Sequence, residues 1–296
     1  VDCHMYKGGT SDIPHVRFAD HYIRRRPEAP VAVVATSADF VNALNPDAVD
    51  SDAQLRLALA HFQAWKEGAD DYGDTHRDLA LAQLANFLES EPASPRALAA
   101  YARGLFKAER IEESLDLFSR AVEVTPGDPQ LLADAALAFQ RMKDFSTAAA
   151  HLEAALKIRP KFRIALVNLA NIRLQTGAYQ EADRLYEQAE IIAPHLPIIK
   201  INRGRAAQAR GNFKKARTLL DEAIKLDPQH AMAHLHRALL EYDHRRFREA
   251  RKVLNRAIKI LPRYGAFYWL RGRVALGERD DSAALRNFRR FLEVSP

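Results

Sequence analysis

The stretch that decides the fold is IALVNLANIRLQTGAYQEADRLYEQAEIIAP, residues 164–194. Its apolar residues recur at spacings of three and four with a break at TGAY, which predicts two helices joined by a turn. Gly177 stands where the first helix ends and can adopt the positive φ that such a turn requires. Pro194 closes the second helix, because proline has no N–H to donate and disfavours helix for the residue before it.

The same pattern recurs every 34 residues along most of the chain. The proline column comprises Pro92, Pro126, Pro160, Pro194, Pro228, Pro262 and Pro296. Twelve residues before each proline stands Ala80, Ser114, Ala148, Ala182, Ala216, Ala250 or Ala284. Twenty-four residues before it stands Gly68, Ala102, Ala136, Ala170, Gly204, Ala238 or Gly272. Small residues are expected where the two helices cross, because a larger side chain would push the backbones apart.

These columns closely resemble the tetratricopeptide repeat. Its small–aromatic–small–proline pattern is matched by Ala170, Tyr179, Ala182, Tyr186, Ala189 and Pro194. The resemblance covers roughly residues 61–296 and implies an all-α, right-handed superhelical solenoid of seven 34-residue helix–turn–helix repeats. We expect the solenoid domain over 51–296, with repeats at about 61–94, 95–128, 129–162, 163–196, 197–230, 231–264 and 265–296. Residues 1–50 do not follow the repeat and are expected to form an irregular segment.

The first and last repeats depart from the pattern. Phe87 and Phe291 stand where the family usually has alanine. Either Phe291 helps to close the end of the solenoid, or the natural chain continues past Pro296. Because the sequence starts at Val1 without an initiator methionine or apolar signal segment, we expect a processed or excised piece.

Charge is unevenly distributed along the chain. Residues 1–94 contain 8 basic and 15 acidic residues, whereas 197–264 contain 17 basic and 6 acidic residues. Such an excess would attract an acidic partner, a nucleic acid or a membrane surface. A solvated helix face is the favoured interpretation, because the arginines are not interleaved with aromatic residues that could stack on bases. No nucleic-acid partner is expected, and no apolar run is long enough to span a membrane.

A candidate binding groove follows from the repeat geometry. Positions 2, 5 or 6, 9, and 12 or 13 of each repeat share one face of the first helix, and that face should line the inner surface of the solenoid. The candidate groove residues are Arg103, Asp134, Arg141, Asn168, Asn171, Asn202, Arg205, His236 and Arg273. Asparagine can both donate to and accept from a peptide backbone, and in the tetratricopeptide family such residues commonly contact bound peptides. Arginine would favour acidic side chains or a terminal carboxylate. The alternative is that the asparagines are simply common at these positions and stay solvated.

Metal binding and catalysis are not predicted. His230 and His234 in QHAMAHLHR (229–237) have metal-ligand spacing, but no carboxylate or cysteine stands close in sequence to complete a site. The sequence contains no Gly-rich phosphate loop, G-x-S-x-G or H-E-x-x-H motif, so we expect no enzymatic activity.

The N-terminal string CHMYKGGTSDIPHVRFADHYI (3–23) resembles the end of a multihaem c-type cytochrome domain, where C-x-x-C-H-M precedes H-x-x-F-x-D-H. The matching residues are Cys3, His4, Met5, His15, Phe18, Asp20 and His21. The resemblance implies that Cys3 and His4 hold a haem, with His15 and His21 as ligands to this or neighbouring haems. The first cysteine of the motif is absent, so no cofactor is expected within this chain as given, but haem c is expected in the full-length protein. The alternative is a lone exposed thiol among surface histidines.

Two functions remain open from the sequence. The first is a scaffold that binds a protein or extended peptide, with acidic sequences preferred, as the recognition module of a larger multihaem cytochrome-like protein. The second is an electron-transfer segment whose repeats dock a haem domain to a redox partner. If the haem interpretation holds, the protein belongs outside the cytoplasm, in the periplasm or on the cell exterior. RNA binding by a helical-repeat code is disfavoured, because the small-residue and proline columns belong to the tetratricopeptide pattern.

Overall fold

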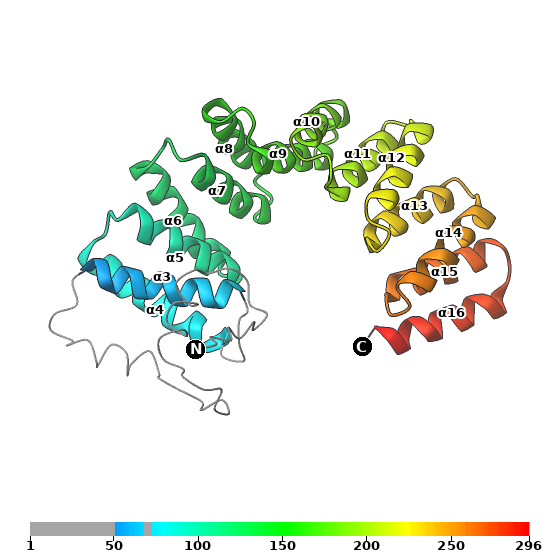
Figure 1. Ribbon diagram of the computed structural model, residues 1–296, viewed down its shortest axis with the longest axis horizontal. Helices are drawn as coiled ribbons and strands as arrows, with labels where there is room; N and C mark the ends of the chain where they lie inside the picture. Colours follow the sequence, from blue (N-terminus) through cyan, green and yellow to red (C-terminus); the bar gives the residue numbers. More distant parts are fainter. Residues whose placement is uncertain (1–50, 68–72, 296) are drawn as a thin grey trace, which may run out of the picture. The chain divides into compact units, whose positions relative to one another are not determined.

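The computed structural model describes residues 51–67 and 73–295, and every regular element within them is an α-helix (Figure 1). The all-α fold of successive helix pairs is therefore confirmed for the described residues. The helices are α3 (Ser51–Glu67), α4 (Gly73–Ser90), α5 (Pro95–Lys107), α6 (Ile111–Val124), α7 (Pro129–Arg141), α8 (Phe145–Ile158), α9 (Arg163–Gln175), α10 (Tyr179–Ile192), α11 (Pro197–Ala209), α12 (Phe213–Leu226), α13 (Ala231–Asp243), α14 (Phe247–Ile260), α15 (Gly265–Gly277) and α16 (Asp281–Val294).

The chain divides into two compact units, Val1–Ala53 and Gln54–Pro296. In each repeat of the second unit, the odd-numbered helix is helix A and the even-numbered helix that follows is helix B. The first pair departs from the 34-residue register, because α3 begins at Ser51 rather than near residue 61. Leu55 and Ala58 are buried on α3, which ends at Glu67, directly before Gly68. The expected irregular segment 1–50, Gly68 and Pro296 lie outside the described residues.

The small-residue columns lie where the helices of each repeat cross. Ala170 and Ala182 have no exposed surface, and every described member of both columns is buried. A Cβ added to Gly272 would lie 2.5 Å from Phe288 Cε1, and one added to Gly204 would lie 3.0 Å from Leu220 Cγ. Glycine at these two positions leaves room for the side chain that faces it across the crossing.

The turn between helix A and helix B has the same backbone conformation in six repeats. One residue in each turn has a positive φ: Glu109, Lys143, Gly177, Gly211, Arg245 and Arg279. The predicted positive φ of Gly177 and Gly211 is confirmed, at 84° and 76°. At the other four positions a non-glycine residue takes φ of 57–63°, although this conformation is unfavourable for L-residues. The packing of the two helices thus imposes the turn even where the local sequence does not favour it.

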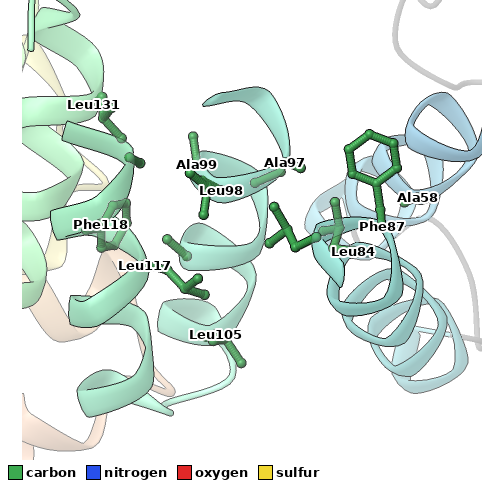
Figure 2. Close-up of a cluster of buried hydrophobic side chains, with 14 of the residues drawn as sticks. Ala58, Leu84, Phe87, Ala97, Leu98, Ala99, Leu105, Leu117, Phe118 and Leu131 are labelled. Carbon is green, nitrogen blue, oxygen red and sulfur yellow. The ribbon is translucent and has the colours of Figure 1, made fainter. Parts of the chain in front are cut away.

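The core continues from one repeat to the next. Figure 2 shows one part of it, where Leu84 and Phe87 of α4, Leu98 and Leu105 of α5 and Phe118 of α6 lie together. Each helix A from α5 to α13 also contacts helix A of the following repeat, whereas no described helix B contacts the next helix B. The A helices therefore form the inner layer of the stack, as the sequence predicts.

A column of arginines that was not predicted from the sequence links successive repeats. Arg203, Arg237 and Arg271 lie at the same position of α11, α13 and α15, and each reaches back to helix B of the preceding repeat. The bonds join Arg203 to Glu187 at 2.8 Å, Arg237 to Asp221 at 2.7 Å and Arg271 to Asn255 at 3.2 Å. The repetition of these arginines at intervals of 34 residues was visible in the sequence. Identifying their hydrogen-bond partners requires knowledge of how the repeats stack.

Candidate functional site: the inner face of the A helices

We call the predicted inner face of the A helices the groove, and all nine candidate residues lie on A helices. They lie on α5, α7, α9, α11, α13 and α15. A hollow of about 400 Å³ crosses three of these helices. Its lining residues are Leu174 of α9, Arg205, Gln208 and Ala209 of α11, and His236, Leu239 and Asp243 of α13. The structure thus brings two predicted residues, Arg205 and His236, to one concave site.

In the N-terminal half of the groove, the arginines are paired with carboxylates of the chain itself. Arg103 Nε donates to Asp134 Oδ2 at 2.5 Å, which joins α5 to α7. Gln130 Nε2 donates to Asp134 Oδ1 at 2.8 Å. Arg141 forms an ion pair with Glu109. Both positive charges are therefore compensated without a ligand.

The asparagines in the middle of the groove mostly bond to other side chains of the chain. Asn171 Oδ1 accepts from Tyr186 Oη at 2.5 Å and from Asn202 Nδ2 at 3.3 Å. Asn202 is only 6% exposed, and its Oδ1 accepts from Arg205 Nη1 at 3.2 Å. These bonds join three helices. The amide of Asn202 is therefore neither free to bind a peptide nor exposed to solvent. Asn168 is half-buried, and its side chain makes no hydrogen bond within the described part of the chain.

Burial changes the proton affinity of two groups beside these asparagines. It raises the pKa of the Tyr186 phenol well above its ordinary value, so this hydroxyl stays a donor at neutral pH. Burial, with a smaller contribution from Arg205, lowers the pKa of His236 to about 4. His236 is consequently neutral at pH 7 and offers one donor and one acceptor nitrogen.

The C-terminal half of the groove presents arginine beside aromatic rings. The Arg273 guanidinium carbon lies 4.9 Å from the ring centroid of Tyr242 and 5.0 Å from that of Trp269, within range of cation–π attraction. Trp269 is 39% exposed, which is unusual for so large an apolar side chain. Tyr242 and Trp269 were not among the candidate residues, although their positions in the repeat, 12 and 5, belong to the predicted groove face.

The described residues contain no group of three or more histidines, cysteines, aspartates or glutamates placed to hold a metal ion. His234 is 4% exposed, and its Nε2 lies 2.8 Å from the carbonyl oxygen of Pro228. Its neighbour in sequence, His230, stands at the N-cap of α13. The predicted haem residues Cys3, His4, His15 and His21 lie outside the described residues. No helix in the described part of the chain has the length and apolar character needed to cross a membrane.

Solved structures with the same architecture share little sequence with this chain. A tetratricopeptide repeat protein from Parabacteroides merdae superposes with a TM-score of 0.65 at 16% identity, covering 80% of this chain and 94% of that one. PilF of Pseudomonas aeruginosa gives a TM-score of 0.56 at 18% identity, covering 68% of this chain and 92% of that one. The Cut9–Hcn1 structure gives 0.58 at 14% identity, covering 87% of this chain and 55% of that one. These likenesses concern the fold alone.

No sequence among curated proteins matches the chain. Models of the tetratricopeptide repeat match residues 66–129, 140–200, 201–264 and 237–296. One of these models alone covers more than half of the sequence. The matched segments contain most members of the small-residue and proline columns, including Ala170, Ala182 and Pro194. The chain belongs to the tetratricopeptide repeat family.

Proposed function

We propose that the groove binds an extended segment of a partner protein and that the chain acts as a non-catalytic scaffold. Tetratricopeptide repeat proteins generally serve as scaffolds that bind protein or peptide partners. The observation that carries the proposal is the hollow of about 400 Å³ across α9, α11 and α13. Leu174 and Leu239 offer apolar surface to a bound side chain, while Arg205 and Gln208 provide donors at its edge.

An extended segment suits this surface better than a folded domain. The groove runs across successive A helices, so a chain laid along it can contact each repeat in turn. Asn168 and neutral His236 provide hydrogen-bonding groups that can contact a peptide backbone without selecting its side chains. Binding then needs little rearrangement of the solenoid, because helices hold the contacting residues in place.

Filling the hollow tests this proposal. Ala209 is exposed on α11 and lines the hollow, so Ala209→Phe should occupy the space without disturbing the core. The probe is a phage-displayed library of random peptides selected on the wild-type chain. Peptides selected on the wild-type chain should bind the Ala209→Phe variant with an affinity at least about tenfold lower. They should bind normally to Thr218→Phe, a matched substitution at an exposed site on α12.

Either of two results contradicts the groove as the binding site. The first is a selection that enriches no peptide above background. The second is an Ala209→Phe variant that binds the selected peptides as tightly as the wild type. Circular dichroism of both variants checks that the helices are intact.

The link to haem proteins rests on residues 3–21 and on nothing in the described part of the chain. We propose that Cys3, His4, His15 and His21 belong to a c-type haem domain in an extracytoplasmic protein, for which the repeats provide recognition. Electron transfer, with the repeats docking a haem domain to a redox partner, is the alternative for the same residues. The natural polypeptide, produced with haem-attachment machinery, should show a c-type visible spectrum. A colourless product would contradict both the haem-protein proposal and the electron-transfer alternative.

A further inference from the structure

The arginines of the groove form two classes that the sequence does not distinguish. Arg103, Arg205 and Arg273 occupy the same position in their repeats. Arg103 lies against Asp134, as described above, and Arg141 against Glu109. Arg205 and Arg273 have no carboxylate partner anywhere in the described part of the chain. Of the candidate groove arginines, those without a carboxylate partner among the described residues are therefore Arg205 of α11 and Arg273 of α15.

The surroundings of Arg205 favour an incoming anion. Arg205 is exposed and lines the hollow, and only one of its hydrogen bonds, to Asn202 Oδ1, is used within the chain. Asp243, the carboxylate that lines the same hollow, accepts a hydrogen bond from Gln208 at 3.0 Å instead. Burial is the main cause of the low pKa of His236, and the positive charge of Arg205 lowers this pKa further. The guanidinium thus has donors directed at space that a ligand carboxylate can fill.

The surroundings of Arg273 add an apolar contact. Tyr242 and Trp269 hold the guanidinium by cation–π contact, which restricts its orientation and leaves its N–H groups available. The exposed part of Trp269 can cover an aliphatic or aromatic side chain. Such an arrangement, an arginine beside a partly exposed tryptophan, has the composition that dominates binding energy at protein interfaces.

We infer that the partner segment is acidic and apolar, with one carboxylate on Arg205, a second on Arg273, and an aliphatic or aromatic side chain in the hollow beside Arg205. The inference rests on the proposed function and restricts it to the C-terminal half of the groove. Packed helices lie about 8–10 Å apart, so two steps from α11 to α15 amount to roughly 16–20 Å. An extended chain advances about 3.3 Å per residue, so the two acidic residues are separated by roughly five or six positions.

Three series of fluorescein-labelled peptides of about twelve residues test the inference. The first series carries two glutamates about five positions apart with leucine and phenylalanine between them. The second replaces both glutamates by glutamine, and the third replaces them by lysine. Fluorescence anisotropy at low and at physiological salt should show that the glutamate series binds at least about tenfold more tightly than the other two, with an advantage that shrinks as salt rises.

Substitution at equivalent repeat positions provides the matched control. Arg205→Gln and Arg273→Gln should each weaken the glutamate peptides by about five- to tenfold and reduce the salt dependence. Arg103→Gln removes the same charge from the same repeat position, and it should leave the affinity within about twofold. Circular dichroism should show unchanged helicity for all three variants.

The possible results separate this inference from the proposal beneath it. The inference of an acidic partner is wrong if glutamine peptides bind as tightly as glutamate peptides, or if Arg103→Gln weakens binding as much as Arg205→Gln. The proposal that the groove binds a peptide is not affected by either result. If no peptide of any series binds and the displayed library also yields none, both fall.

Discussion

Replacing Arg203 by glutamine should destabilise the interface between α10 and α11. Arg203 lies on α11, is 9% exposed, and bonds to three carboxylates of α10. Its Nε lies 3.0 Å from Asp183, its Nη2 2.8 Å from Glu187 and its Nη1 2.6 Å from Glu190. Glu187 is 59% exposed at its side chain, so solvent screens that contact and it contributes little. The effect of the substitution therefore depends on Asp183 and Glu190.

The expected loss is about 2 kcal/mol. A net contribution of about 1.5–3 kcal/mol is usual for a hydrogen bond to a charged group, and two such bonds to shielded carboxylates would give more than 3 kcal/mol. Lysines offset part of this loss, because Lys215 stays 2.6 Å from Asp183 and Lys200 stays paired with Glu190. Neither carboxylate is left without a partner, which keeps the penalty below that of an isolated buried charge.

Urea denaturation followed by circular dichroism measures this loss by linear extrapolation. Arg184→Gln is the control, because Arg184 is exposed on α10, the helix that carries the three carboxylates. This substitution should change the free energy of unfolding by less than about 0.5 kcal/mol. Combining Arg203→Gln with Asp183→Asn should cost less than the sum of the two single changes, since the residues interact directly. An Arg203→Gln variant within about 0.5 kcal/mol of the wild type would refute the reasoning.

Three further predictions concern acid, the turns and a buried hydroxyl. Burial alone would raise the pKa values of Asp183 and Glu190, but bonds to lysine and arginine hold both below their ordinary values of 3.8 and 4.5. The folded state therefore binds fewer protons than the unfolded state, so stability is full above about pH 5 and the urea midpoint should fall as the pH drops below 4.5; a midpoint that rises on acidification would contradict this. Gly177→Ala should cost about 1 kcal/mol and lower the melting temperature, because its φ is +84° although the added Cβ would meet open space; an unchanged melting temperature would contradict this. Tyr186→Phe should cost about 1 kcal/mol through the lost hydrogen bond to Asn171, whereas a neutral result in urea would show that this bond adds nothing.

The fold was predictable because its determinants are local and recur in every repeat. A crossing that admits no large side chain needs a small residue in each repeat, so Ala182 belongs to a column that is visible without any structure. The turn conformation of Lys143 was not visible, because lysine has no preference for positive φ and only the pairing of α7 with α8 imposes it. The early start of α3 at Ser51 was hidden for a similar reason, since the 34-residue register does not hold there.

The groove was predictable as a face, but the state of its side chains was not. Helical spacing predicts that Asn202 and Asn168 share one surface, and both lie at the same position of successive A helices, α11 and α9. Spacing cannot tell that the amide of Asn202 is taken by Asn171 of the preceding repeat while Asn168 makes no such bond. That difference depends on which side chains of adjacent repeats come within about 3 Å of one another. No single repeat contains this information.

Net charge is a poor guide to ligand binding, because it does not show which charged side chains are paired between adjacent repeats. The 17 basic residues of 197–264 suggest a uniformly positive surface, yet several of them are already paired inside the solenoid. Arg217 and Arg237 both bond to Glu241, which is 2% exposed, so those charges stabilise an interface between repeats and are not available to a ligand. Arg205 differs from them by facing the hollow without a carboxylate partner among the described residues. A basic residue is therefore a good candidate for ligand binding when it lies at a concave surface and has no carboxylate partner within the chain. A count of charges cannot reveal this property.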